Sequence, residues 1–248
     1  MKPGPRIRGA LRRVADLVFP PHGYDGGPYP QAPGLSSSAW SKVRFLEAPV
    51  CDGCGAPFEF AGDPRCASCL ARPFAFSRAR AACVYDDASR ELILKFKHGD
   101  QTHFAALFAR WVGRAAADLV EEADAVAPVP LHPFRLISRR YNQAAEIARP
   151  FARAADLEYL PDALVRSRRT ETQGGKSGSG RRRNVQGAFL VPEHRRKQVK
   201  GRRILLVDDV MTTGATLESC AKALLKAGAR AVDVVVVAKV ASGKDLSI

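Results

Sequence analysis

Hydrophobic positions from about residue 79 onward follow two alternating patterns, short continuous apolar runs and longer stretches with apolar residues three or four apart. The continuous runs predict buried strands over 81–85, 125–129, 204–207 and 232–240. The helical spacing predicts four helices, over 89–98, 104–115, 142–155 and 217–225. Ser89 is the expected cap of the first helix, and Pro150 should kink or divide the third. Because apolar runs lie on both sides of helices, the order predicts an α/β fold with a parallel sheet flanked by helices.

The first 48 residues show a different pattern. Residues 6–19 place Leu11, Val14 and Val18 at helical spacing opposite a basic face, which predicts a helix packed on the protein or lying on an acidic lipid surface. Charged residues interrupt this stretch, so it is not a secretory signal, and we expect a cytoplasmic protein. Residues 20–48 are rich in proline and glycine and predict irregular chain.

The cysteines add a small module between these parts. Cys51 and Cys54, then Cys66 and Cys69, form two C-x2-C pairs with eleven residues between them, a spacing typical of a tetrahedral zinc site. Two disulfides or an iron–sulfur site are the alternatives, and the lack of an export signal disfavours disulfides. No open fourth ligand is evident, which indicates a structural metal. We therefore expect an N-terminal helix and irregular segment over 1–48, a zinc-ribbon module over 49–76 and the α/β domain over 77–248.

Composition and charge narrow the class of protein. Hydrophobic residues make up 46% of the chain, which excludes wholesale disorder, and no apolar run approaches the roughly 20 residues that cross a bilayer. With 39 Lys and Arg against 25 Asp and Glu, the net charge is +14. Between Arg166 and Arg203 stand 13 basic residues and two acids, a local charge of +11. This excess points to phosphate groups, nucleic acid or an acidic surface as partner, although a solvated basic loop has the same composition.

The segment 204–216, ILLVDDVMTTGAT, concentrates the candidate chemistry. A buried strand ends in Asp208 and Asp209, and a turn rich in threonine then opens a helix. Helix N-termini attract phosphate, and glycine lets the backbone approach it closely. The adjacent acids would repel a phosphate but accept hydrogen bonds from sugar hydroxyls, so the pattern fits a 5-phosphorylated ribose. The alternative is an ordinary strand-to-helix turn capped by threonine. The candidate binding residues are Asp208, Asp209, Val210, Met211, Thr212, Thr213, Gly214, Ala215 and Thr216.

This motif resembles the loop with which type I phosphoribosyltransferases bind 5-phosphoribosyl-1-pyrophosphate (PRPP). The resemblance extends to FKHGD at 96–100, APVPLHPFRLISRRYNQA at 127–144 and RRRNVQGAF at 181–189, which are similar to the ComF family. Members of that family join an N-terminal zinc ribbon to a phosphoribosyltransferase-like domain and are associated with bacterial competence and DNA uptake. The likeness covers about residues 45–240. Relatives often carry further cysteines upstream, where this chain has Ser36–Ser38, so a second metal site is not expected here.

The resemblance implies a magnesium-dependent transfer of the phosphoribosyl group, with Asp208 and Asp209 as catalytic residues holding the ribose hydroxyls directly or through Mg²⁺. Pyrophosphate would be bound by two loops, through the residues Arg135, Arg139, Arg140, Lys176, Arg181, Arg182 and Arg183. Lys95, Lys97 and His98 either line the same cleft or simply end a helix. Nothing in the sequence names the acceptor. The competing interpretation is a non-catalytic accessory protein that binds single-stranded DNA and works with competence proteins, although no aromatic residues interleave the basic run.

Overall fold

The computed structural model describes residues 24, 34–57, 64–98, 103–131, 141–167 and 187–240. The chain divides into two compact units, Met1–Val43 and Arg44–Ile248. In the first unit the structure describes helix α2 (Ser37–Lys42), which Ser36 caps by accepting the backbone N–H of Ala39. The prediction of irregular chain throughout 20–48 is therefore wrong at this helix, because the serines supply a cap. The helix predicted over 6–19 lies outside the described residues.

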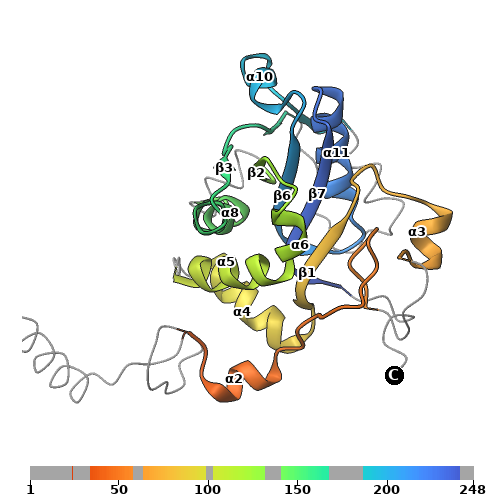
Figure 1. Ribbon diagram of the computed structural model, residues 1–248. Coiled ribbons are helices and arrows are strands. Elements are labelled where there is room, and N and C mark those ends of the chain that lie inside the picture. The colour runs from red at the N-terminus through yellow and green to blue at the C-terminus, as the bar shows by residue number, and fades with distance from the viewer. Residues whose placement is uncertain are drawn as a thin grey trace, which may run out of the picture. The chain divides into compact units, whose positions relative to one another are not determined.

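A five-stranded sheet forms the centre of the second unit (Figure 1). Its strands are β1 (Ala79–Val84), β7 (Ala231–Lys239), β6 (Arg203–Met211), β2 (Ala125–Pro128) and β3 (Glu158–Tyr159), in that spatial order. All four neighbouring pairs are parallel, which confirms the predicted fold class. Every residue of β7 is buried, as expected for a central strand of a sheet that is covered on both faces.

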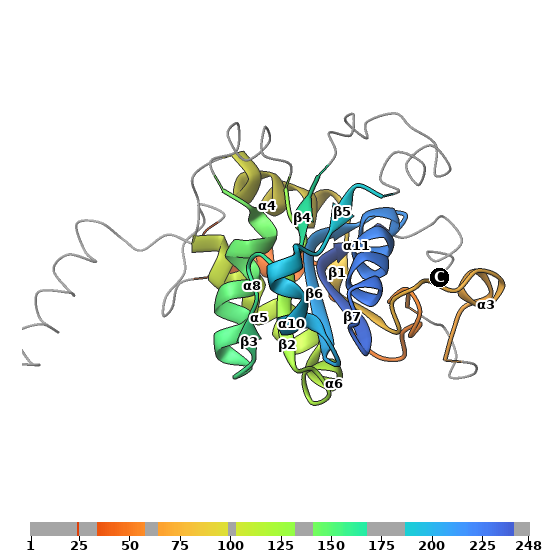
Figure 2. The same ribbon diagram turned by 90° about the horizontal axis from the view of Figure 1, so that it is seen from above.

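Helices cover the two faces of this sheet. The larger ones are α4 (Asp87–His98), α5 (His103–Ala115), α8 (Gln143–Ala154) and α11 (Ala215–Lys226). Helices α5 and α8 pack against each other on one face, and α11 lies on the other (Figure 2). The remaining elements are α3 (Ala67–Ala71), α6 (Ala117–Val120), β4 (Val165–Arg166), β5 (Phe189–Leu190), η1 (Glu193–Arg195) and α10 (Arg196–Val199). None of the described helices combines the length and hydrophobicity that a bilayer crossing demands.

Two helix predictions are corrected. Helix α4 begins at Asp87, not after a cap at Ser89, because Asp86 and Ser89 exchange side-chain-to-backbone hydrogen bonds of 3.0 and 3.1 Å in a capping box. Helix α8 continues through Pro150, which contradicts the predicted division of the helix; the predicted kink stays a prediction. Its apolar face, which includes Ile147 and Phe151, is buried on both sides of the proline. Tertiary packing of that face therefore outweighs the hydrogen bond that proline cannot donate.

A buried carboxylate holds the amino-terminal edge of the sheet together. Asp233 of β7 is fully buried and accepts a hydrogen bond from the backbone of Arg78 at 3.1 Å. The guanidinium groups of Arg78 and Arg203 lie 3.3 and 2.9 Å from the same carboxylate, and both also contact Glu122. Arg203 is the first residue of β6, Arg78 directly precedes β1, and Asp233 lies in β7. One charge cluster therefore joins these three strands.

Candidate functional site

The two candidate aspartates lie where one strand extends beyond its neighbour. Strand β2 ends with the pair Pro128–Val207, whereas β6 continues beside β7 as far as the pair Met211–Lys239. The sequence predicted that the strand ends in Asp208 and Asp209, but β6 continues past them to Met211. They stand at the carboxyl edge of the sheet, beyond the last residue of β2. Ligands of open α/β sheets bind at this edge.

A cleft of about 310 Å³ opens beside the aspartates. Its volume falls in the range of roughly 300–1,000 Å³ that is usual for small-molecule sites. The cleft is lined by Tyr85, Lys97, Val129, Pro130, Leu131, Asn142, Gln143, Ala144, Arg166, Asp208, Asp209, Val210, Thr212 and Thr216. Acids and cations from separate segments thus share one cavity, and the carboxylates are not sealed into the interior.

The charge balance of the cleft depends on a carboxylate pair and a lysine. Burial first, and then the neighbouring Asp209, raise the pKa of Asp208 to about 8. The backbone N–H of Asp209 donates to Asp208 Oδ1 at 2.9 Å. Lys97, on α4, places Nζ 2.6 Å from Asp209 Oδ2, and both side chains are largely buried, at 17% and 16% exposure. The lysine thus neutralises the charge of Asp209.

The turn at Thr212–Thr216, which we call the phosphate turn, follows β6 and begins α11. Gly214 is the N-cap of α11 with a φ of 72°, a left-handed conformation that favours glycine. As a glycine, this N-cap residue has no side chain to cap the helix, which leaves the first N–H groups of α11 without the usual N-cap acceptor. A hollow of about 20 Å³ lies over the turn. The Met211 side chain is buried, and its Cε lies 2.9 Å from where a Cβ on Gly214 would stand.

The structure also brings residues into the cleft that the site prediction left out. Arg166 of β4 lines the cavity, and its charge lowers the pKa of Asp208, against the effect of burial. Asn142 lines it too, and its amide caps α8 while donating to Val129 O at 3.0 Å. For Lys97 the FKHGD motif was a signal, but nothing adjacent in sequence marks Arg166. The predicted pyrophosphate residues Arg135, Arg139, Arg140, Lys176, Arg181, Arg182 and Arg183 lie outside the described residues.

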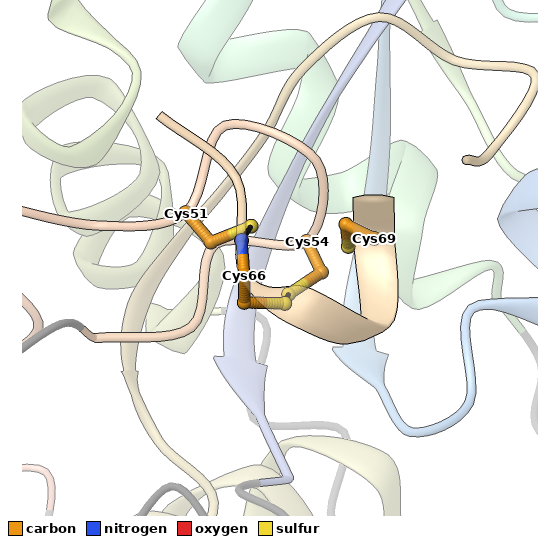
Figure 3. A group of neighbouring side chains, drawn as sticks. All are labelled: Cys51, Cys54, Cys66 and Cys69. Carbon is orange, nitrogen blue, oxygen red and sulfur yellow. Dashed lines mark hydrogen bonds between the residues drawn. The ribbon is translucent and has the colours of Figure 1, made fainter. Parts of the chain in front are cut away.

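The second candidate site is a group of cysteines whose side chains converge (Figure 3). The Sγ atoms of Cys51, Cys54, Cys66 and Cys69, here called the four-cysteine cluster, all lie within 4.8 Å of one another. A zinc ion with four bonds of about 2.3 Å separates its sulfurs by about 3.8 Å. The Sγ atoms of Cys54 and Cys66 lie 3.9 Å apart. None of the chain's cysteines forms a disulfide, so the geometry fits a tetrahedral metal site and contradicts the disulfide alternative.

The backbone around the four-cysteine cluster shows the usual features of a metal-binding knuckle. The N–H of Cys66 donates to Cys51 Sγ at 3.2 Å, and the N–H of Gly55 donates to Cys51 O at 2.7 Å. A hydrogen bond from Cys54 is the main cause that lowers the pKa of Cys51, and the same contact raises the pKa of Cys54, so this pair of thiols favours a single thiolate, on Cys51. A Cβ at Gly53 would lie 2.9 Å from Cys69 Sγ, so glycine is needed for the sulfurs to approach. When bound, zinc would supply a structural cross-link between the two knuckles.

The two remaining cysteines are structural. Cys83 in β1 and Cys220 in α11 are fully buried, and the Cys83 thiol donates to Val237 O at 3.2 Å. Burial raises the pKa of Cys83 to about 12 and raises that of Cys220 as well. Neither thiol is suited to act as a nucleophile, because both are buried and stay protonated at neutral pH.

The fold and the cleft define a phosphoribosyltransferase-like α/β protein, and residues 141–247 match the family model of the phosphoribosyl transferase domain. Competence protein F of Haemophilus influenzae is 31% identical over 206 residues, which cover 81% of this chain and 88% of that protein. DNA utilization protein YhgH of Escherichia coli K12 is 30% identical, covering 79% of this chain and 87% of its own. Competence protein ComFC of Streptococcus pneumoniae is 25% identical, covering 79% and 90%. The chain belongs to this ComF family.

Proposed function

We propose that the chain binds PRPP, or a related 5-phosphorylated ribose, in the cleft beside Asp208 and Asp209. The observation that carries this proposal is that the cleft beside the two carboxylates and the hollow over the helix N-terminus share the lining residues Asp208, Thr212 and Thr216. A ribose 5-phosphate has a diol at one end and a dianion at the other, which matches this order of acceptors and donors. The match to the phosphoribosyl transferase domain supports the same ligand class.

In this proposal the phosphate turn binds the 5-phosphate through the first N–H groups of α11 and the hydroxyls of Thr212, Thr213 and Thr216. Asp208 and Asp209 accept hydrogen bonds from the 2- and 3-hydroxyls of the ribose. Because a hydroxyl donates best to an ionised carboxylate, binding favours loss of the proton that the raised pKa leaves on Asp208.

Lys97 and Arg166 are the described cations that line the cleft, and we assign them to the pyrophosphate end of PRPP. Departure of pyrophosphate from C1 leaves an oxocarbenium-like centre, so cations at the leaving group and carboxylates near the sugar both lower the barrier. Lys97 exchanges its contact with Asp209 for one with pyrophosphate as the diol arrives. The oxygen-rich donor set also suits Mg²⁺, which would neutralise the phosphate charge.

The direct test is calorimetric binding of PRPP with Mg²⁺ to the wild-type protein and to D208N and D209N. We expect saturable binding to the wild type and a loss of at least tenfold in affinity for each variant, since one charge-assisted hydrogen bond contributes about 1.5–3 kcal/mol. Asp118, an exposed acid on α6, gives a matched control as D118N, which should bind normally. Pyrophosphate release with a panel of bases and amines then identifies an acceptor. Absence of PRPP binding by the folded wild-type protein would refute the proposal.

A second candidate function is binding of single-stranded DNA by a protein that acts in competence. The net charge of +14 favours it, and relatives bear the names competence protein and DNA utilization protein. If DNA binds through phosphate contacts, its affinity should fall steeply with salt, and neutralising Arg181–Arg183 should reduce the slope. A salt-independent affinity, or an unchanged slope in that variant, would exclude this mode.

A further inference from the structure

The chain between the four-cysteine cluster and β1 packs against the phosphate turn. This segment, residues 72–77, is called the strap below. A Cβ placed on Gly214 would lie 2.9 Å from Phe74 Cε1 and 3.1 Å from Phe74 Cζ. The Phe74 ring therefore rests against the backbone of the turn at the residue with the left-handed conformation.

A hydrogen bond ties the same strap to the helix that the turn begins. The backbone N–H of Ala75 donates to Glu218 Oε2 at 2.7 Å, and Glu218 lies in the first turn of α11. The strap thus contacts both the glycine of the turn and the start of the helix. These two contacts fix the position of the N–H groups that face the hollow over the turn.

The strap is itself anchored at both ends. On one side it follows Cys69, which is buried in a single hydrophobic core with Phe76 and Met211. On the other side the N–H of Ser77 donates to Val232 O at 2.8 Å, next to β1. The rings of Phe74 and Phe76 stack with centroids 4.5 Å apart and planes 12° apart. Phe74 therefore packs against the same core that contains Cys51, Cys54 and Cys69.

We propose that Phe74 is a positioning residue for the phosphate turn, and that a metal bound to the four-cysteine cluster holds it in place. Without metal the cysteine end of the strap is released, Phe74 loses its support, and the turn becomes mobile. The metal site is then energetically coupled to the anion site, although it supplies no ligand to it. The consequence for ligand affinity rests on the proposed function, whereas the consequence for the mobility of the turn does not.

Hydrogen–deuterium exchange of the full-length protein tests the coupling without any ligand. Removing zinc with a chelator should increase exchange in peptides that cover residues 49–77 and 210–218, while the centres of β6 and β7 stay protected. F74A with zinc still bound should increase exchange at 210–218 alone, and chelation should then add little at that segment. F74L should restore part of the protection, and L70A, an exposed change in the same module, should behave as the wild type.

Calorimetry with ribose 5-phosphate tests the effect on the anion site. We expect chelation to weaken binding on the order of tenfold in the wild type and in L70A, but much less in F74A, because effects that pass through one residue are not additive. Zinc content is measured in parallel to show that F74A keeps its metal.

Unchanged exchange at 210–218 after zinc removal would overturn the proposal, as would a full metal response in F74A. Increased exchange across the whole sheet would also overturn it, because the metal would then support the entire fold. If ribose 5-phosphate fails to bind any variant while the exchange results are as expected, the coupling stands and the proposed function fails.

Discussion

The raised pKa of Asp208 predicts that affinity for ribose 5-phosphate rises with pH. In the free protein, burial and Asp209 raise this pKa to about 8, so the carboxyl is mostly protonated at neutral pH. The ribose hydroxyls favour the carboxylate, so binding releases the proton. If only the ionised form binds, about a tenth of the protein is competent at pH 7 and about nine tenths at pH 9, and the affinity should rise about tenfold between these values.

Isothermal titration calorimetry provides the assay, and the range above pH 7 avoids protonation of the phosphate itself, whose second pKa is about 6. Titrations in buffers with different ionisation enthalpies report the protons released, which should approach one per ligand at pH 7 and decline toward pH 9. D208N, which cannot ionise, should bind weakly with no such dependence. D209N removes the like charge beside Asp208 and should move the midpoint of the pH dependence below 8.

Two results would refute this reasoning. An affinity that does not change between pH 7 and pH 9 would show that Asp208 is already ionised in the free protein or does not contact the ligand. A slope that persists in D208N would show that another group carries the proton. If the affinity does not change with pH but D208N still lowers it, the site is right and the pKa is wrong. If D208N has no effect either, the site is wrong.

Three further substitutions test separate parts of the structure. K97M should weaken PRPP binding at least tenfold more than ribose 5-phosphate binding, which falls only because the pKa of Asp208 rises when the lysine is lost. Equal losses in calorimetry would contradict the assignment of Lys97 to pyrophosphate. G214A should destabilise the protein by about 1–3 kcal/mol in urea denaturation and abolish ribose 5-phosphate binding. The added Cβ would meet Phe74 at a residue whose backbone is left-handed. A variant as stable as the wild type would show that the turn can relax. D233A leaves two arginines without their buried partner and should lower the free energy of unfolding by about 3–5 kcal/mol. D118A removes an exposed partner and should lower it by less than about 1 kcal/mol. Equal losses in urea denaturation would contradict this account.

The sequence alone determined the features whose chemistry lies within a few adjacent residues. The order of strand, paired acids and threonine-rich turn at 204–216 predicted the site motif, because a strand, its following turn and the next helix form one local unit. The two C-x2-C pairs predicted the four-cysteine cluster for a similar reason, since each knuckle fixes two sulfurs through local backbone geometry. Apolar periodicity predicted the parallel α/β fold, because burial on both faces requires continuous apolar strands.

Only the tertiary structure decided which distant segments meet at these motifs. Strand β2 ends before β6 does, and this difference in length opens the cleft into which Lys97 and Arg166 project. The contact of Phe74 with Gly214 spans 140 positions of the chain, and no local pattern records it. Pro150 stays within one helix because the buried face of α8 contributes more than its missing hydrogen bond costs. Such encounters depend on strand order and packing, which are properties of the whole chain and not of any single segment.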